Sequence, residues 1–176
     1  MIIGLSGYAR SGKDCLALTL IAHGFTRVAF ADALREALYC LNPIVRDGVR
    51  VQDLVNYIDW EATKNNYPEV RNLLQRMGTE VGRELYGQNF WVERAFAKVQ
   101  GRENVVFTDV RFPNEFDAVK SAGGQMWRIN RPNITATNAH VSETALDGFP
   151  FDIVIDNDGT LEELESKCLE LLNPPQ

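Results

Sequence analysis

The stretch GLSGYARSGKD, residues 4–14, is the strongest indication of the fold in this sequence. Its segment 7–13 has the spacing G-x-x-x-x-G-K of a phosphate-binding loop, in which backbone N–H groups converge on phosphate oxygens at a helix N-terminus. A strand-like run, 2–6, precedes the loop and a helical stretch, 13–22, follows it. The alternative is a tight strand-to-helix turn in which Asp14 only favours the helix dipole. The agreement of strand context, glycine spacing and Lys13 favours the phosphate loop.

Asp14 stands where such loops usually carry Ser or Thr, whose hydroxyl contacts the Mg²⁺ of a bound nucleotide. Two unit charges about 4 Å apart repel by roughly 4 kcal/mol at an effective dielectric of about 20, so a bare carboxylate opposes a triphosphate. A divalent cation between them reverses the sign, and carboxylate oxygens are good ligands for Mg²⁺. Asp14 is therefore predicted as a metal-side group. Asp109, which ends an apolar strand, is the predicted second metal carboxylate, with a helix or turn cap as its alternative.

Composition indicates one soluble, compact domain: 176 residues, 45% hydrophobic and 24% charged. A net charge of −6 argues against a broad nucleic-acid or membrane-binding surface. The three cysteines, Cys15, Cys40 and Cys168, form no C-x-x-C pair and are predicted to be reduced core thiols, without disulfide or zinc. Because the N-terminal run resembles neither a signal peptide nor a membrane span, we expect a cytoplasmic protein.

Strand-like and helical stretches alternate along the chain, which predicts an α/β fold with a parallel sheet and helices on both faces. We expect strands at 2–6, 27–30, 104–109, 125–130 and 151–155, and flanking helices at 13–22, 32–41, 115–121 and 161–171. The segment of about 43–100 is predicted as a helical insertion on the substrate side. Residues 131–143 are predicted as a lid-like loop. All of 1–176 is predicted as a single domain.

Several motifs together resemble the bacteriophage deoxynucleoside monophosphate kinase family, across nearly the whole chain and in the right order. They are GYARSGKD, FADALR, QRMGTEVGRE, TDVRFPNE, HVSET and DIVIDNDGTLEEL. The resemblance implies a P-loop nucleoside monophosphate kinase-like fold. It also implies transfer of the γ-phosphoryl group of ATP to deoxynucleoside monophosphates with Mg²⁺. The phosphate loop of this family commonly ends in Lys-Asp, so Asp14 fits its pattern.

The resemblance also implies roles for individual residues. The acceptor is an anionic phosphate that needs no general base, so arginine forks suit it. The expected catalytic residues are Lys13, Arg128 and Arg131. The expected ATP-binding residues are Ala9, Arg10, Ser11, Gly12, Lys13, Asp14, Arg131 and Asn157. The expected acceptor-binding residues are Asp32, Arg35, Arg76, Arg83, Asp109, Arg111, Asn114, His140 and Glu143. For Asp32, a helix N-cap is the alternative role.

Two other functions stay open at this point. Phosphomevalonate kinase also uses a Gly-Lys-Asp loop and a phosphate acceptor, although FADALR and TDVRFPNE favour the nucleotide kinase. A non-enzymatic nucleotide-binding switch would leave the ordered arginines unexplained. The expected partners are ATP and a deoxynucleoside monophosphate, with no nucleic acid or membrane. The sequence leaves open whether the protein is a homodimer and which bases it accepts.

Overall fold

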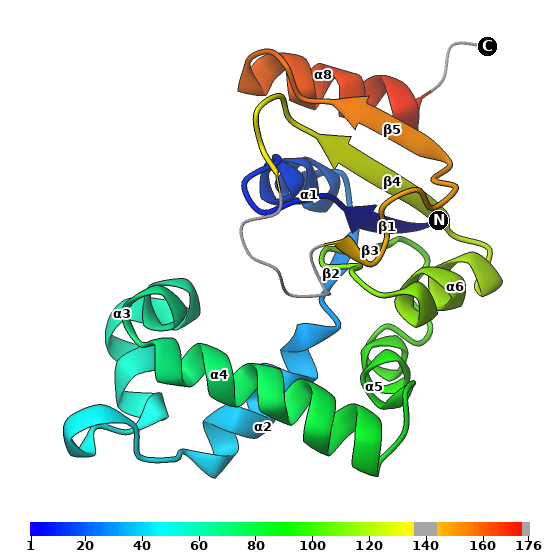
Figure 1. Cartoon of the computed structure of the whole chain (residues 1–176). Coiled ribbons are helices and arrows are strands. Elements are labelled where there is room, and N and C mark those ends of the chain that lie inside the picture. The colour runs from blue at the N-terminus through cyan, green and yellow to red at the C-terminus, as the bar shows by residue number, and fades with distance from the viewer. Residues whose placement is uncertain (136–143, 174–176) are drawn as a thin grey trace. The chain divides into compact units, whose positions relative to one another are not determined.

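The computed structural model describes residues 1–135 and 144–173 (Figure 1). The chain divides into two compact units. The first comprises Met1–Phe30 and Phe96–Gln176, and the second comprises Ala31–Ala95. Among the described residues, no helix is long and apolar enough to cross a membrane.

The first unit is built on a five-stranded sheet in the order β2-β3-β1-β4-β5, and every neighbouring pair is parallel. The strands are β1 Ile2–Ser6, β2 Thr26–Val28, β3 Val105–Phe107, β4 Gln125–Asn130 and β5 Ile153–Asp156. The central position of β1 brings the loop after it between the carboxyl ends of β3 and β4. Open parallel sheets bind ligands at this edge. The predicted parallel sheet is confirmed.

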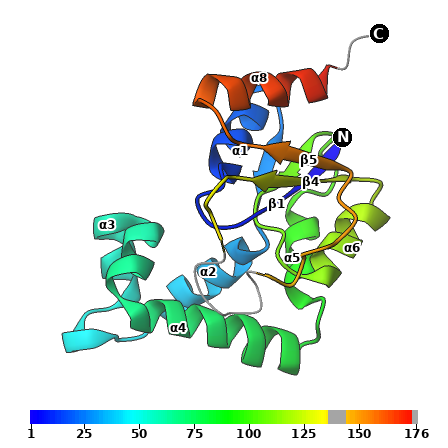
Figure 2. The same ribbon diagram turned by 45° about the horizontal axis from the view of Figure 1, so that its top comes forward.

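Helices cover both faces of this sheet (Figures 1 and 2). Helices α1 (Lys13–Ala22) and α8 (Leu161–Leu172) pack together over a buried cluster that includes Ile3, Leu5 and Trp127. On the opposite face, α6 (Pro113–Ser121) packs on β1 and β4. The alternation of β1 explains this division, because Ile3 and Leu5 point to one side and Gly4 to the other. A Cβ at Gly4 would lie 2.5 Å from the Met126 sulfur, so a larger residue there would displace the Met126 side chain.

The second unit is helical. Its elements are α2 (Ala31–Leu41), η1 (Arg46–Gly48), α3 (Val51–Asn66), α4 (Pro68–Arg76), the π-helix η2 (Met77–Leu85) and most of α5 (Phe90–Lys98). Five of its buried side chains form one hydrophobic cluster: Leu38, Val51, Leu54, Val70 and Leu74. The helical unit begins at 31 rather than at the predicted 43, because α2 contributes to this core and packs on α3 and α4. That the two units act as a single domain stays a prediction.

The cysteine prediction is wrong for two of the three residues. Cys168 is buried in α8, but Cys15 and Cys40 are exposed. In α1 the buried positions are Leu16, Ala17, Thr19 and Leu20, which leaves Cys15 on the outer side. Burial, with a smaller contribution from Glu165, raises the pKa of the Cys168 thiol to about 11.

Candidate active site

The loop between β1 and α1 has a conformation that requires its glycines. Gly7 and Gly12 have φ values of 139° and 109°, which disfavour residues with a Cβ. A Cβ at Gly7 would overlap the carbonyl oxygen of Ile129, and one at Gly12 would lie 2.5 Å from Asn157 Nδ2. Because α1 starts directly after Gly12, the first backbone N–H groups of the helix lie at the loop. Helix N-termini of this kind bind anions, because their first N–H groups point out of the helix and the positive end of the helix dipole lies there.

Lys13 holds its ammonium group against this loop. Its Nζ donates hydrogen bonds of 2.6 Å to the carbonyl oxygen of Gly7 and 2.7 Å to that of Tyr8. The lysine charge therefore lies at the loop, where phosphate groups would be neutralised. Its contact with the outer phosphates of ATP stays a prediction.

Asn157, directly after β5, contacts the phosphate loop. Its side chain is 6% exposed, and Nδ2 donates a 2.8 Å hydrogen bond to the carbonyl oxygen of Ser11. The backbone N–H of Asn157 donates to the Asn130 carbonyl oxygen at 2.7 Å, which fixes the residue between β4 and β5. Asn157 was expected to bind the nucleotide, and the observed contact is with the loop itself. The Ser11 hydroxyl is also buried here, and its Oγ has no hydrogen-bond partner among the described residues.

The two predicted metal carboxylates belong to neighbouring segments of the first unit. Asp14 is exposed in the first turn of α1. Asp109 follows β3, and its Oδ1 accepts a 2.7 Å hydrogen bond from the backbone N–H of Phe30, beyond the end of β2. The turn-stabilising alternative is therefore realised for one oxygen of Asp109. Carboxylates together with substrate phosphates are a donor set that Mg²⁺ accepts without a cage of protein ligands. No group of three or more acidic, His or Cys residues that would hold a metal occurs within 1–135 and 144–173.

The turn after β3 is held by a residue for which the sequence suggested no role. Glu115 is 3% exposed, and its Oε2 accepts hydrogen bonds from the N–H groups of Arg111 (2.8 Å) and Phe112 (3.1 Å). Glu at this position after Pro113 is a helix N-terminus signal that could have identified it. Glu115 fixes the backbone from which the exposed Arg111 extends, and half-buried Asn114 lies in the same turn.

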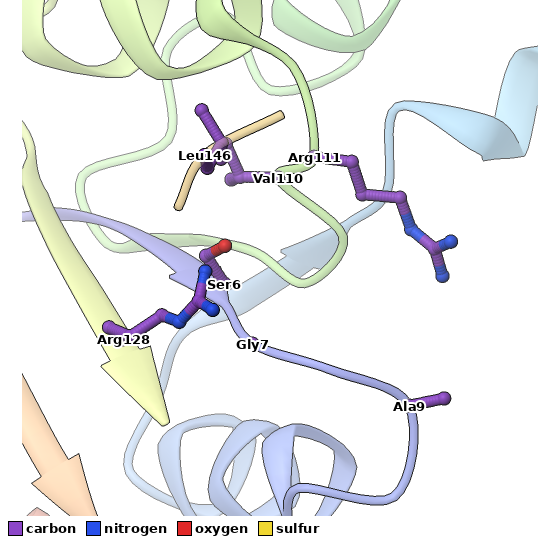
Figure 3. A pocket seen from close by; sticks show the side chains of 7 residues that line it. All are labelled: Ser6, Gly7, Ala9, Val110, Arg111, Arg128 and Leu146. Carbon is purple, nitrogen blue, oxygen red and sulfur yellow. The ribbon is translucent and has the colours of Figure 1, made fainter. Parts of the chain in front are cut away.

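A small pocket opens beside the phosphate loop, entirely within the first unit (Figure 3). Its lining comprises Ser6, Gly7, Ala9, Val110, Arg111, Arg128 and Leu146. Figure 3 shows the Arg128 side chain reaching from β4 toward Ser6, whereas that of Arg111 extends away from Arg128. The pocket brings two predicted arginines to the loop. Arg131 also approaches it, through a long 3.5 Å contact from Nη1 to the Arg10 carbonyl oxygen.

Two further residues hold Arg128, and the sequence did not identify either of them. Arg128 Nη2 donates a 2.8 Å hydrogen bond to Asp147 Oδ1, and the Tyr8 hydroxyl donates one of the same length to Asp147 Oδ2. The hydrogen bond to Asp147, with burial as the next cause, raises the pKa of Tyr8. No local pattern predicts this cluster, because 139 residues separate Tyr8 from Asp147.

Four predicted acceptor-binding residues belong to the helical unit: Asp32, Arg35, Arg76 and Arg83. Arg35 pairs with Glu61 at 3.3 Å, and Arg76 pairs with Glu80 at 3.1 Å. Such partly exposed pairs contribute little stability, and the acceptor-binding role of both arginines stays a prediction. Asp32 lies in the first turn of α2 and half-buried Arg83 lies in η2.

The π-helix η2 belongs to the motif around Arg76 and Arg83. Such helices are rare and are found frequently at functional sites. The Trp91 indole packs directly on Gly82, where any Cβ would overlap the ring, and its Nε1 donates a 2.9 Å hydrogen bond to the Gly78 carbonyl oxygen. The close approach of the indole explains why position 82 is glycine, and both contacts with Trp91 support η2.

The remaining two predicted acceptor-binding residues, His140 and Glu143, lie outside the described residues. Most of the predicted lid, 131–143, also lies outside the described residues. Of the site predicted from the sequence, the first unit thus brings together the phosphate loop, Arg128, Arg131, Asn157 and the turn from Asp109 to Asn114.

A parallel sheet whose central strand leads through a glycine-dependent phosphate loop into a helix is the architecture of P-loop nucleotide-binding proteins, which include kinases. The family model for deoxynucleotide monophosphate kinase matches residues 46–168, and the chain belongs to this family. A relative from Acanthamoeba polyphaga mimivirus, named for the same kinase, is 31% identical over an alignment 192 residues long. The alignment covers 98% of this chain and 96% of the relative.

The deoxynucleotide monophosphate kinase of Enterobacteria phage T4 is 30% identical over 129 residues. The match covers 70% of this chain and 51% of the phage enzyme, so the chain matches about half of that protein. Among solved structures, dephospho-CoA kinase from Campylobacter jejuni is similar with a TM-score of 0.48 at 10% identity. That match covers 97% of this chain and 94% of the other.

Proposed function

We propose that the protein phosphorylates deoxynucleoside 5′-monophosphates to diphosphates, with ATP as donor, and so supplies DNA precursors. The observation that carries this is a phosphate loop with Lys13 at its carbonyl groups and Arg128 beside it, in a chain of the deoxynucleotide monophosphate kinase family. The loop and Lys13 would hold the β- and γ-phosphates of ATP. The arginines would neutralise the charge that is shared between donor and acceptor phosphates during transfer.

We further propose Mg²⁺ as the metal, with Asp14 and Asp109 as its protein-side carboxylates, directly or through water. Mg²⁺ keeps several water ligands and prefers phosphate oxygens with one or two carboxylates, which the two residues would supply. The metal would neutralise phosphate charge when bound. Asp109 would hold the metal-side turn in place through its bond to the Phe30 N–H.

As residues that bind the acceptor phosphate we propose Arg35, Arg76, Arg83 and Arg111. The acceptor is a phosphate monoester that is already ionised, so positioning and charge neutralisation supply the catalysis. The net charge of −6 supports small nucleotides rather than nucleic acid as partners. We also predict that this protein acts in the cytoplasm of a host cell and has no membrane partner. A homodimer is compatible with this proposal.

A panel of acceptors tests this function. With ATP and Mg²⁺ present, we expect ADP formation to depend on a deoxynucleoside monophosphate and to remain at background with mevalonate 5-phosphate. Turnover of mevalonate phosphate alone would identify the other kinase. Slow ATP hydrolysis that no acceptor changes would indicate a nucleotide-dependent switch.

A further inference from the structure

The guanidinium group of Arg128 is enclosed on several sides. The side chain is 12% exposed, and its Cζ lies 4.9 Å from the Tyr8 ring centroid and 5.5 Å from that of Phe151. Cation–π contacts of this kind hold an arginine in place and leave its N–H groups at the rim. Arg128 emerges from the carboxyl end of β4, where Ser6 of β1 is its register partner. Its head therefore lies beside the phosphate loop, as Figure 3 also shows.

Asp147 connects this arginine to the loop. One carboxylate oxygen accepts from Arg128 Nη2 and the other from the Tyr8 hydroxyl, each at 2.8 Å. Tyr8 is itself a residue of the phosphate loop, between Gly7 and Ala9. The backbone N–H of Asp147 donates to the Thr144 carbonyl oxygen at 2.9 Å, so a turn holds the carboxylate. The bond to Asp147 occupies Nη2, and a guanidinium has five N–H donors with which to bond a phosphate in addition.

We propose that Tyr8 and Asp147 are positioning residues that fix the Arg128 guanidinium beside the phosphate loop, where it bonds the phosphoryl group in transfer. The inference rests on the proposed function, because it assigns these two residues a role in the same reaction. Lys and Arg side chains lose considerable conformational freedom when they are fixed. An arginine fixed before the substrate binds does not lose that freedom during the reaction, which favours the transition state.

The opposite role for Asp147 predicts the opposite result. If its carboxylate competed with substrate phosphate for Arg128, removing its charge would release the arginine and raise the rate. The two ring contacts favour positioning, because Tyr8 and Phe151 hold the guanidinium in the same place as the ion pair does. A competitor alone would not need these rings.

A double-mutant cycle with steady-state kinetics tests the proposal. The single variants are Asp147→Asn, Arg128→Ala and Tyr8→Phe, the last of which keeps the ring and removes the hydroxyl. Asp147→Asn and Tyr8→Phe are each also combined with Arg128→Ala. We expect Asp147→Asn and Tyr8→Phe to lower kcat about tenfold, with the KM for ATP changed less than about twofold. In the Arg128→Ala background, neither change should lower kcat further, because both act through the arginine.

Asp152→Asn is the matched control, since Asp152 also joins a cation to an N–H donor. It accepts from Lys120 Nζ and from the Met126 N–H, both at 2.6 Å, near the amino end of β4. We expect it to leave kcat unchanged, and thermal melts confirm folding of each variant. A raised kcat in Asp147→Asn, or effects that add fully to Arg128→Ala, would overturn the positioning role. Absence of deoxynucleotide phosphorylation by the wild-type protein would instead overturn the proposed function, and the inference with it.

Discussion

Replacing Asn157 by Ala removes the side-chain hydrogen bond that supports the phosphate loop at Ser11. The 2.8 Å bond from Nδ2 to the Ser11 carbonyl oxygen joins the end of β5 to the loop after β1, and both side chains are buried. The alanine variant leaves this carbonyl oxygen without its partner. Water has little access, because Asn157 is 6% exposed and Gly12 packs against its amide.

The expected loss of stability is about 1–3 kcal/mol, the cost of leaving one buried acceptor unpaired. In a protein of this size, each kcal/mol lowers Tm by roughly 2–4 °C, so Tm should fall by roughly 2–12 °C. Because the lost bond fixes the loop rather than the acceptor side, we expect the KM for ATP to rise more than the KM for the deoxynucleotide. Asn157→Asp should be worse, since a carboxylate oxygen would then face the Ser11 carbonyl oxygen.

Calorimetry and initial rates over a range of ATP concentrations measure both effects. Asn72→Ala is the control, because it makes the same chemical change at an exposed position of α4. An unchanged Tm together with an unchanged KM for ATP would refute the supporting role. An unchanged Tm with a raised KM for ATP would instead mean that Asn157 contacts the nucleotide directly.

Three further outcomes follow from the same structure. Lys13→Ala should remain folded and lose nearly all phosphoryl transfer, because removing a charge at the transferring phosphates costs several kcal/mol of transition-state stabilisation; near-normal kcat would exclude the assigned loop chemistry. Asp14→Ala and Asp14→Asn should need more Mg²⁺ for half-maximal rate, with partial recovery in Asp14→Ser. Mg²⁺ curves identical to wild type, with a stability loss of about 0.3–1 kcal/mol for the alanine variant, would leave only the helix-dipole role. In the folded protein at neutral pH, an alkylating reagent followed by mass spectrometry should modify the two exposed cysteines and spare Cys168, whose thiol is buried with a pKa of about 11; early modification of Cys168 would contradict its burial.

The sheet could be predicted from the sequence because its signals are local. Short apolar runs alternate with helical stretches. The glycine spacing of 7–12 marks the turn between the first strand and the first helix. The structure confirms strands within or close to every predicted range. The extent of the helical unit was less predictable. The helix Ala31–Leu41 follows a strand like any other, and only contacts with distant helices assign it to the second core.

The site residues also differ in whether local sequence or distant contacts identify them. Phosphate-loop chemistry depends on neighbours in sequence, so Lys13 and Gly12 could be identified directly. Asp147 could not, because its two partners come from the loop after β1 and from the end of β4. Burial also decides between similar residues. Cys15 and Cys168 both lie in apolar helices, yet only the second faces the core.

The most direct test of the central claim is the stoichiometry of products after incubation with ATP, Mg²⁺ and each deoxynucleoside monophosphate in turn. The account predicts that the wild-type protein forms one deoxynucleoside diphosphate for every ADP with at least one of these acceptors, and that Lys13→Ala forms neither above background. Formation of ADP without any deoxynucleoside diphosphate, across all of these acceptors, would contradict it.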